Sequence, residues 1–241
     1  MSGHSKWNNI KHKKEKSDAA KAKIFTKIGK EMAVAIKAGG PDPNVNNKLR
    51  DLIAKAKANN VPNENIQRTI KKFSESNDVT YEEITYEGYG PSGVAIIVET
   101  QTDNRNRTAG NVRAWFNKYG GNLGQSGCVA FMFEEKGVIT ILDEDEEIDE
   151  DQIMEDALDC GAEDIKSDEG EYTIYTEPAE LDSVRDAIIA RGYKIDTADL
   201  AKVPSTYVTL ESEEDIENME KMLDKFNEDD DVNAVYHNWN A

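Results

Sequence analysis

The spacing of apolar residues changes once along this chain, between Ser74 and Thr80, and this change limits the fold more than any other feature. Before it, apolar side chains recur every three or four residues, as they do on one face of a helix. After it, they come in short runs that are typical of strands. The sequence therefore predicts a helical N-terminal domain followed by mixed α and β structure.

Three amphipathic helices are expected in the helical part, and lysines mark the first of them. Its apolar positions, from Ser17 onward, are Ile24, Phe25, Ile28, Met32, Ala35 and Ile36. Lys23, Lys27 and Lys30 fall on the opposite side of this helix, where we expect their ammonium groups to face solvent. Two further helices follow before Ser74.

The sequence after Thr80 predicts two groups of strands and helices. The first group is a ββαβ run, with its elements at residues 81–90, 94–101, 104–121 and 128–133 and a turn at 120–124. The second group, from residue 137 to a strand near Tyr193, follows the order βαββαβ, which is the ferredoxin-like motif. One more strand, helix and strand complete the chain.

The ββαβ run alone would leave a short sheet with exposed edges, so we expect the C-terminal segment to return to it. The predicted domains are a flexible basic arm at 1–20, a helical domain at 21–75, a central α/β domain at 76–134 plus 204–241, and an inserted acidic ferredoxin-like domain at 135–203. The predicted fold class is α+β, with an N-terminal three-helix domain followed by two α/β domains, at least one of them a ferredoxin-like βαββαβ unit.

Charge is unevenly distributed along the chain. Residues 1–75 hold 17 basic and 7 acidic side chains, whereas residues 76–241 hold 12 basic and 41 acidic ones, so the net charges are +10 and −29. This asymmetry favours a protein whose basic end meets a polyanion. The candidate nucleic-acid-binding residues of this end are Lys6, Trp7, Lys11, His12, Lys13, Lys14, Lys16, Lys23, Lys27 and Lys30. The alternative is a lysine-rich helix that is merely solvated.

A second candidate site lies where a buried strand gives way to a helix that Asp103 or Asn104 can cap. Arg105 and Arg107 fall in the first turn of this helix, where the helix dipole disfavours cations, and Arg113 lies about two turns further on. Guanidinium groups at this place suit a phosphate ligand. The alternative is that these arginines pair with carboxylates of the protein itself.

The sequence offers no catalytic constellation, no metal site and no cofactor motif. The acidic run at residues 143–151 lacks the glycine and the final glutamate of a calcium-binding loop, so a solvated loop is expected there. Cys128 and Cys160 have no metal-site or redox spacing and are expected to be small buried residues. We expect no membrane-spanning segment, no signal peptide and a cytoplasmic location.

Four stretches, MSGHSKWNNIKHKKEKSDAAKAKIFTKIGKEM, AGGPDPNVNNKLRDLIAKAKANNVP, YEGYGPSGVAIIVETQTDNRNRT and GGNLG, resemble the YebC family. The resemblance extends over the whole chain. It implies three domains, with the last segment returning to the second, and no enzyme activity. Bacterial members are usually described as DNA-binding transcriptional regulators. The mitochondrial relative is a translational activator, and some bacterial members act on ribosomes stalled at proline runs.

Two functions remain open at this point. The first is a DNA-binding transcriptional regulator. The second is a ribosome-associated translation factor that binds ribosomal RNA, which a lysine-rich arm and an acidic body favour because extended duplex would repel the body. An enzyme is not expected, and a monomer is favoured as the oligomeric state.

Overall fold

The computed structural model describes residues 18–75, 80–143, 148–168 and 170–240. These residues form two compact units. The larger unit contains residues 18–129 and 211–235, and the smaller unit contains residues 130–210 and 236–240.

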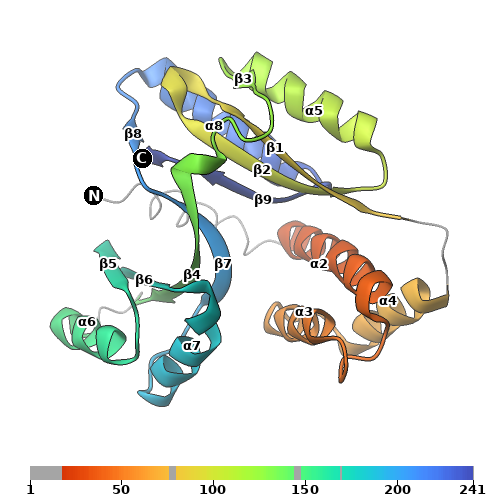
Figure 1. The fold of residues 1–241 in the computed structure, drawn as a ribbon, viewed down its shortest axis with the longest axis vertical. Coiled ribbons are helices and arrows are strands. Elements are labelled where there is room, and N and C mark those ends of the chain that lie inside the picture. Colours follow the sequence, from red (N-terminus) through yellow and green to blue (C-terminus); the bar gives the residue numbers. More distant parts are fainter. Residues whose placement is uncertain (1–17, 76–79, 144–147, 169, 241) are drawn as a thin grey trace. The chain divides into compact units, whose positions relative to one another are not determined.

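Three helices open the larger unit, as the sequence predicts (Figure 1). They are α2 (Asp18–Gly39), α3 (Asn47–Ala58) and α4 (Asn63–Glu75). The apolar stripe of α2 packs on the other two helices through Ile28, Met32 and Ile36, which are all buried. Asn46 is the N-cap of α3, since its side chain accepts a hydrogen bond from the backbone N–H of Leu49 at 3.0 Å.

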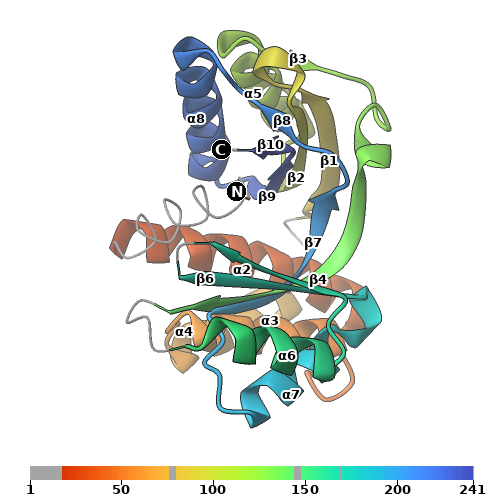
Figure 2. The same cartoon turned by 90° about the vertical axis from the view of Figure 1, so that its left-hand side faces the viewer.

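A four-stranded sheet of order β3-β1-β2-β9 forms the rest of the larger unit, with α5 and α8 together on one face (Figures 1 and 2). The aromatic ring of Phe226 on α8 joins the two helices, because it contacts both Phe116 and Trp115 of α5. These elements are β1 (Glu82–Tyr89), η1 (Pro91–Gly93), β2 (Ala95–Thr102), α5 (Arg105–Lys118), β3 (Asn122–Leu123), α8 (Glu213–Glu228) and β9 (Val232–His237).

The sheet is therefore assembled from distant parts of the sequence. Strand β9 lies beside β2, and the backbone N–H of Gln101 donates to the carbonyl of Asp231 at 2.8 Å. Residues 236–237 of the same strand fall in the smaller unit, so β9 runs from one unit into the other.

The prediction of a strand at residues 128–133 is wrong, and the prediction of a turn at 120–124 is correct only for its start at Gly120. The turn region contains β3, which pairs with Gly88 and Tyr89 of β1. The other segment forms a loop and the short helix η2 (Ala130–Met132). The side chain of Glu87 on β1 explains why residues 128–133 do not form the predicted strand. Its carboxylate accepts from the N–H groups of Gly127 at 2.7 Å and Val129 at 2.9 Å. Those N–H groups are therefore not available to a neighbouring strand.

The smaller unit has the predicted order βαββαβ. Its strands pair antiparallel in the order β5-β6-β4-β7, and α6 and α7 pack on one face of the sheet (Figure 2). The elements of this unit are β4 (Phe133–Leu142), α6 (Glu150–Asp159), β5 (Asp164–Asp168), β6 (Glu171–Thr176), η3 (Pro178–Glu180), α7 (Leu181–Ala190) and β7 (Thr197–Pro204). Two short strands, β8 (Val208–Thr209) and β10 (Trp239–Asn240), pair with each other in parallel.

The α+β class, with three helices followed by sheet domains, is confirmed. Two details differ from the prediction. The last strand of the smaller unit begins at Thr197 rather than near Tyr193, whose hydroxyl instead donates to the Asp156 carboxylate at 2.6 Å. Cys128 of the larger unit and Cys160 of the smaller unit are only half-buried rather than buried.

Two glycines of the larger unit should respond to alanine in opposite ways. A Cβ at Gly88 would lie 2.5 Å from the backbone oxygen of Asn122 and 2.9 Å from the ring of Phe116, whereas a Cβ at Gly110 on α5 meets nothing within 4 Å. Gly88→Ala should therefore lower the free energy of unfolding by about 1–3 kcal/mol. Gly110→Ala should raise it by roughly 0.5–1 kcal/mol, because alanine favours the helix.

Urea unfolding followed by circular dichroism measures both changes. Equal stabilities for the two variants would contradict the close approach of β1 and β3.

Candidate nucleic-acid interface

The predicted site residues of the basic arm, Lys6, Trp7, Lys11, His12, Lys13, Lys14 and Lys16, lie outside the residues that the structure describes. Their part in binding stays a prediction. The other six predicted residues are described, and they fall into two groups with different surroundings.

Three lysines of α2 do not face solvent as the helix periodicity predicts. Lys23, Lys27 and Lys30 are half-buried, and their ammonium groups donate to the last two residues of α8 and to Asp230, which follows this helix. The acceptors are the carbonyl oxygens of Glu228 at 3.3 Å, Asn227 at 3.3 Å and Asp230 at 2.8 Å, in the same order. The last carbonyls of a helix lack partners within the helix and carry partial negative charge, so cations are favourable there.

Lys30 also makes the most buried ion pair of this region, with Asp231. Its Nζ lies 2.6 Å from Oδ1 of Asp231, and the two side chains are 12% and 5% exposed. The other carboxylate oxygen, Oδ2, accepts from Arg107 Nη2 at 2.5 Å, Thr108 Oγ1 at 2.9 Å and Thr102 Oγ1 at 3.1 Å. One carboxylate therefore joins α2, α5 and β2 to the start of β9.

These contacts decide the ionisation of Asp231. Burial alone would raise the pKa of its carboxyl, but the hydrogen bonds from Lys30, Arg107 and Thr108 outweigh burial and lower the pKa to about 2. The same hydrogen bond from Arg107, with a second one to Asp103, raises the pKa of the guanidinium. Both groups are thus held in their charged forms.

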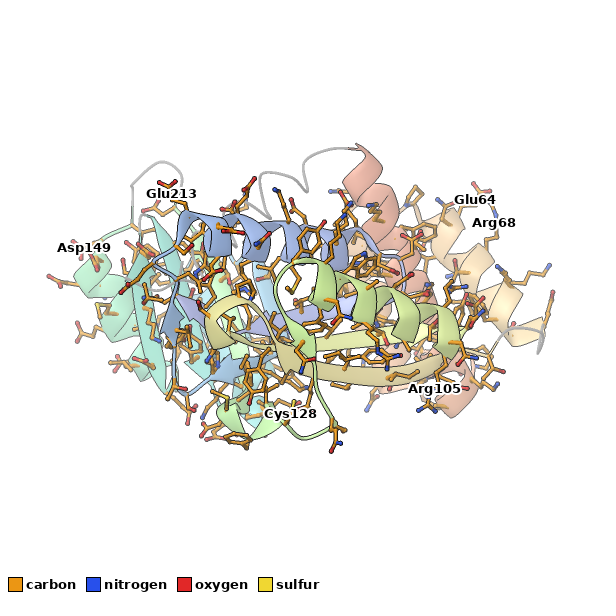
Figure 3. The ribbon with its side chains drawn as sticks, turned by 90° about the horizontal axis from the view of Figure 1, so that it is seen from above. Glu64, Arg68, Arg105, Cys128, Asp149 and Glu213 are labelled. Atoms are coloured by element: carbon orange, nitrogen blue, oxygen red, sulfur yellow. The ribbon has the colours of Figure 1, made fainter. Side chains whose placement is uncertain are left out.

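The arginines of α5 divide into one paired residue and two free ones. Asn104 is the N-cap of this helix and no acidic residue lies in its first turn. Arg107 pairs with Asp231 and with Asp103, which lies 2.8 Å away, so the alternative of intramolecular pairing is correct for this arginine. Within the described part of the chain, Arg105 and Arg113 make no hydrogen bond or ion pair, and both are exposed. Arg105 lies at the start of α5 (Figure 3).

Helices α3 and α4 expose a second set of cations, most of which the sequence analysis did not single out. Its members are Lys48, Arg50, Lys55, Lys57, Arg68, Lys71 and Lys72. Arg68 pairs with Glu64 at 2.9 Å on the surface of α4 (Figure 3), and such an exposed pair contributes little to stability. The signal in the sequence was the spacing of these residues away from the apolar positions of each helix.

Among the described residues, no group of three or more histidine, cysteine, aspartate or glutamate side chains is placed to hold a metal ion. None of the described helices has the length and apolar character needed to cross a membrane.

The chain is similar to known proteins in sequence and in fold. A family model described as the TACO1/YebC protein N-terminal domain matches residues 5–76, and one described as the TACO1/YebC second and third domain matches residues 81–239. Two relatives named "probable transcriptional regulatory protein", from Acetivibrio thermocellus and Agathobacter rectalis, are 55% and 56% identical over 240 residues, which are 99% of each chain. The crystal structure of a conserved hypothetical protein from Aquifex aeolicus has a TM-score of 0.83 and 42% sequence identity. The match covers 92% of this chain and 91% of that one.

Charge reversal should change the stability of the protein differently at the two arginines in the first turn of α5. Arg105→Glu places an acid near the positive end of the helix dipole, so the free energy of unfolding should stay the same or rise by about 0.3–1 kcal/mol. Arg107→Glu sets a carboxylate against Asp231 and Asp103 and should destabilise the protein by about 1–3 kcal/mol, because Asp231 is buried while the side chain at 107 is 47% exposed. Thermal melts of the two variants at pH 7 give the comparison. A stable Arg107→Glu protein would show that the ion pair with Asp231 does not hold α5.

The stability of the protein should also depend on the protonation of Asp231. Its folded pKa of about 2 lies below the ordinary value of 3.8, so the stabilisation is fully present above about pH 4 and is lost as the pH falls toward 2. The shift corresponds to about 2 kcal/mol at neutral pH. Denaturant titrations of the native protein and Asp231→Asn from pH 7 to pH 2.5 should show a stability difference that shrinks below pH 4. A difference that stays constant over this range would contradict the assignment.

Proposed function

The chain belongs to the TACO1/YebC family, and from this premise we propose that it is a nucleic-acid-binding regulator of gene expression. The observation that supports this most directly is Arg105. It is an exposed cation in the first turn of α5, without an ion pair among the described residues, in a chain with 48 acidic residues.

The position of Arg105 costs stability unless an anion is bound. The N-terminus of a helix carries partial positive charge and free backbone N–H groups, so a cation there is unfavourable and a phosphate is favourable. Arg113 is also exposed, further along the same helix, and can add a second contact with the phosphate backbone. Arg107 has a structural part in this site, because its contacts with Asp231 and Asp103 hold the first turn of α5 in place.

The exposed cations of α3 and α4 provide further phosphate contacts in the same unit. Lysine and arginine contacts with phosphates supply affinity that does not depend on base sequence, and they position the protein on the nucleic acid. The names of the two relatives, which describe transcriptional regulators, favour DNA as the target.

Ribosomal RNA is the second candidate target, and the charge distribution favours it. Residues 76–241 carry a net charge of −29, which would be repelled by the length of a DNA duplex. A ribosome offers irregular RNA that a basic N-terminal part can reach while an acidic body stays at a distance.

Binding measurements with Arg105→Glu test this proposal. The variant should bind its target at least about fivefold more weakly, and the slope of log affinity against log salt should fall by about one. Lys194→Glu is the matched control, because Lys194 is an exposed cation of the smaller unit without an ion pair among the described residues. The control should bind as the native protein does.

The target itself is identified by two assays at the same salt concentration. A gel shift on promoter DNA measures the first candidate, and co-sedimentation with ribosomes measures the second. Binding in neither assay, or equal losses in Arg105→Glu and Lys194→Glu, would refute the proposal.

A further inference from the structure

The lysines of α2 are covered by a segment with an unusual density of acids. Residues 227–231 read Asn-Glu-Asp-Asp-Asp and comprise the last two residues of α8 and the three residues after it. We refer to them as the acidic segment. It accepts hydrogen bonds from Lys23, Lys27 and Lys30 through three backbone carbonyls and one carboxylate. The lysine row is thus fully engaged by a part of the chain about 200 residues away.

The acidic segment offers these lysines the same chemistry as a nucleic-acid backbone. Its four carboxylates and the terminal carbonyls of α8 present closely spaced oxygen acceptors in a strongly negative field. A phosphodiester chain likewise presents a regular row of anionic oxygens. Because a lysine ammonium makes no geometric distinction between such acceptors, the two compete for the same donors.

We propose that the acidic segment is an intramolecular substitute for nucleic acid, and that it shields Lys23, Lys27 and Lys30 until a polyanion displaces it. This inference rests on the proposed nucleic-acid binding and adds its regulation. The shielded form binds weakly through α5, α3 and α4, and the open form adds the lysine row. The observed affinity is then lower than that of the open form, because only a small fraction of the protein is open at any time.

The three lysines differ in how tightly they contact the acidic segment, and this difference predicts the order in which a polyanion releases them. Lys23 and Lys27 are half-exposed, and each donates to a carbonyl of the acidic segment at 3.3 Å, a long hydrogen bond that a phosphate oxygen can replace. Lys30 makes shorter contacts, at 2.8 Å and 2.6 Å, and its pair with Asp231 is buried. We therefore expect Lys23 and Lys27 to be released first, with Lys30 still anchoring α2 to Asp231.

Neutralising two carboxylates of the acidic segment tests the inference while keeping the backbone carbonyls that accept from Lys23 and Lys30. Glu228 and Asp230 are exposed, and Glu228→Gln with Asp230→Asn removes two charges and the surface ion pair of Glu228 with Lys225 at 2.6 Å. The matched control is Glu213→Gln with Glu217→Gln, which removes two exposed acids toward the other end of the same helix, one of them paired with Lys221 at 2.6 Å (Figure 3). Both proteins have the same net charge.

The probes are a fluorescein-labelled single-stranded RNA of about 20 nucleotides and a DNA duplex of the same length. The first double variant should bind them about threefold or more tightly than the native protein, and the control should change much less. Circular dichroism melts confirm that both variants are folded. If both double variants bind the probes more tightly by the same factor, net charge alone explains the effect and the inference is wrong.

Hydrogen exchange of the native protein gives an independent readout. Adding the RNA should speed deuterium uptake at residues 227–231, because displacement frees a segment whose amides now bond within it, such as Asp231 N–H to Asp229 Oδ1 at 2.7 Å. Slower or unchanged uptake in protein that binds the probe would refute shielding while leaving the proposed function intact. Absence of binding to either probe, in all variants, would refute the proposed function and the shielding with it.

Discussion

A single buried carboxylate, that of Asp231, holds the larger unit together. Its two oxygens accept from Lys30 of α2, from Arg107 and Thr108 of α5 and from Thr102 of β2, and its own carbonyl accepts from Gln101. Burying a carboxylate costs several kcal/mol unless its lone pairs are satisfied by charged or polar donors. Here four residues donate hydrogen bonds to the carboxylate and Gln101 donates to the backbone carbonyl, so the start of β9 is fixed beside β2 and the lysine side of α2 is fixed against α8.

The helix dipole has opposite signs at the C-terminus of α8 and the N-terminus of α5, so cations are favourable at the first place and unfavourable at the second. At the C-terminus of α8, the lysines of α2 meet carbonyls of favourable sign, so their placement is explained by folding alone. At the N-terminus of α5, Arg105 meets a dipole of unfavourable sign and no counter-charge among the described residues. Folding does not explain that arginine, whereas the phosphate contact that we propose would. Arg107 lies between these cases, since Asp231 and Asp103 compensate its charge.

The sequence by itself determined the classes of structure and the places where charge collects. The helical spacing of Ile28, Met32 and Ile36 and the strand runs after Thr80 predict the elements correctly, because burying an apolar face is a local requirement that each segment meets in its own pattern. The same holds for the βαββαβ order of the smaller unit. The arginines of α5 were found in the sequence for a similar reason, since a helix N-terminus and its dipole are readable from a few consecutive residues.

Only the tertiary structure decided which of these charges are free. Lys23, Lys27 and Lys30 lie on the polar side of α2 in any sequence analysis, yet their partners follow some 200 residues later, and no periodicity carries that information. Arg107 and Arg105 both lie in the first turn of α5, and the carboxylate of Asp231, just before β9, distinguishes them because it pairs with Arg107 alone. The misplaced strand at residues 128–133 has the same origin, because the side chain of Glu87 takes the backbone N–H groups of a segment 40 residues away. Hydrogen bonds and ion pairs depend on which groups meet in space, whereas apolar periodicity depends on the segment alone.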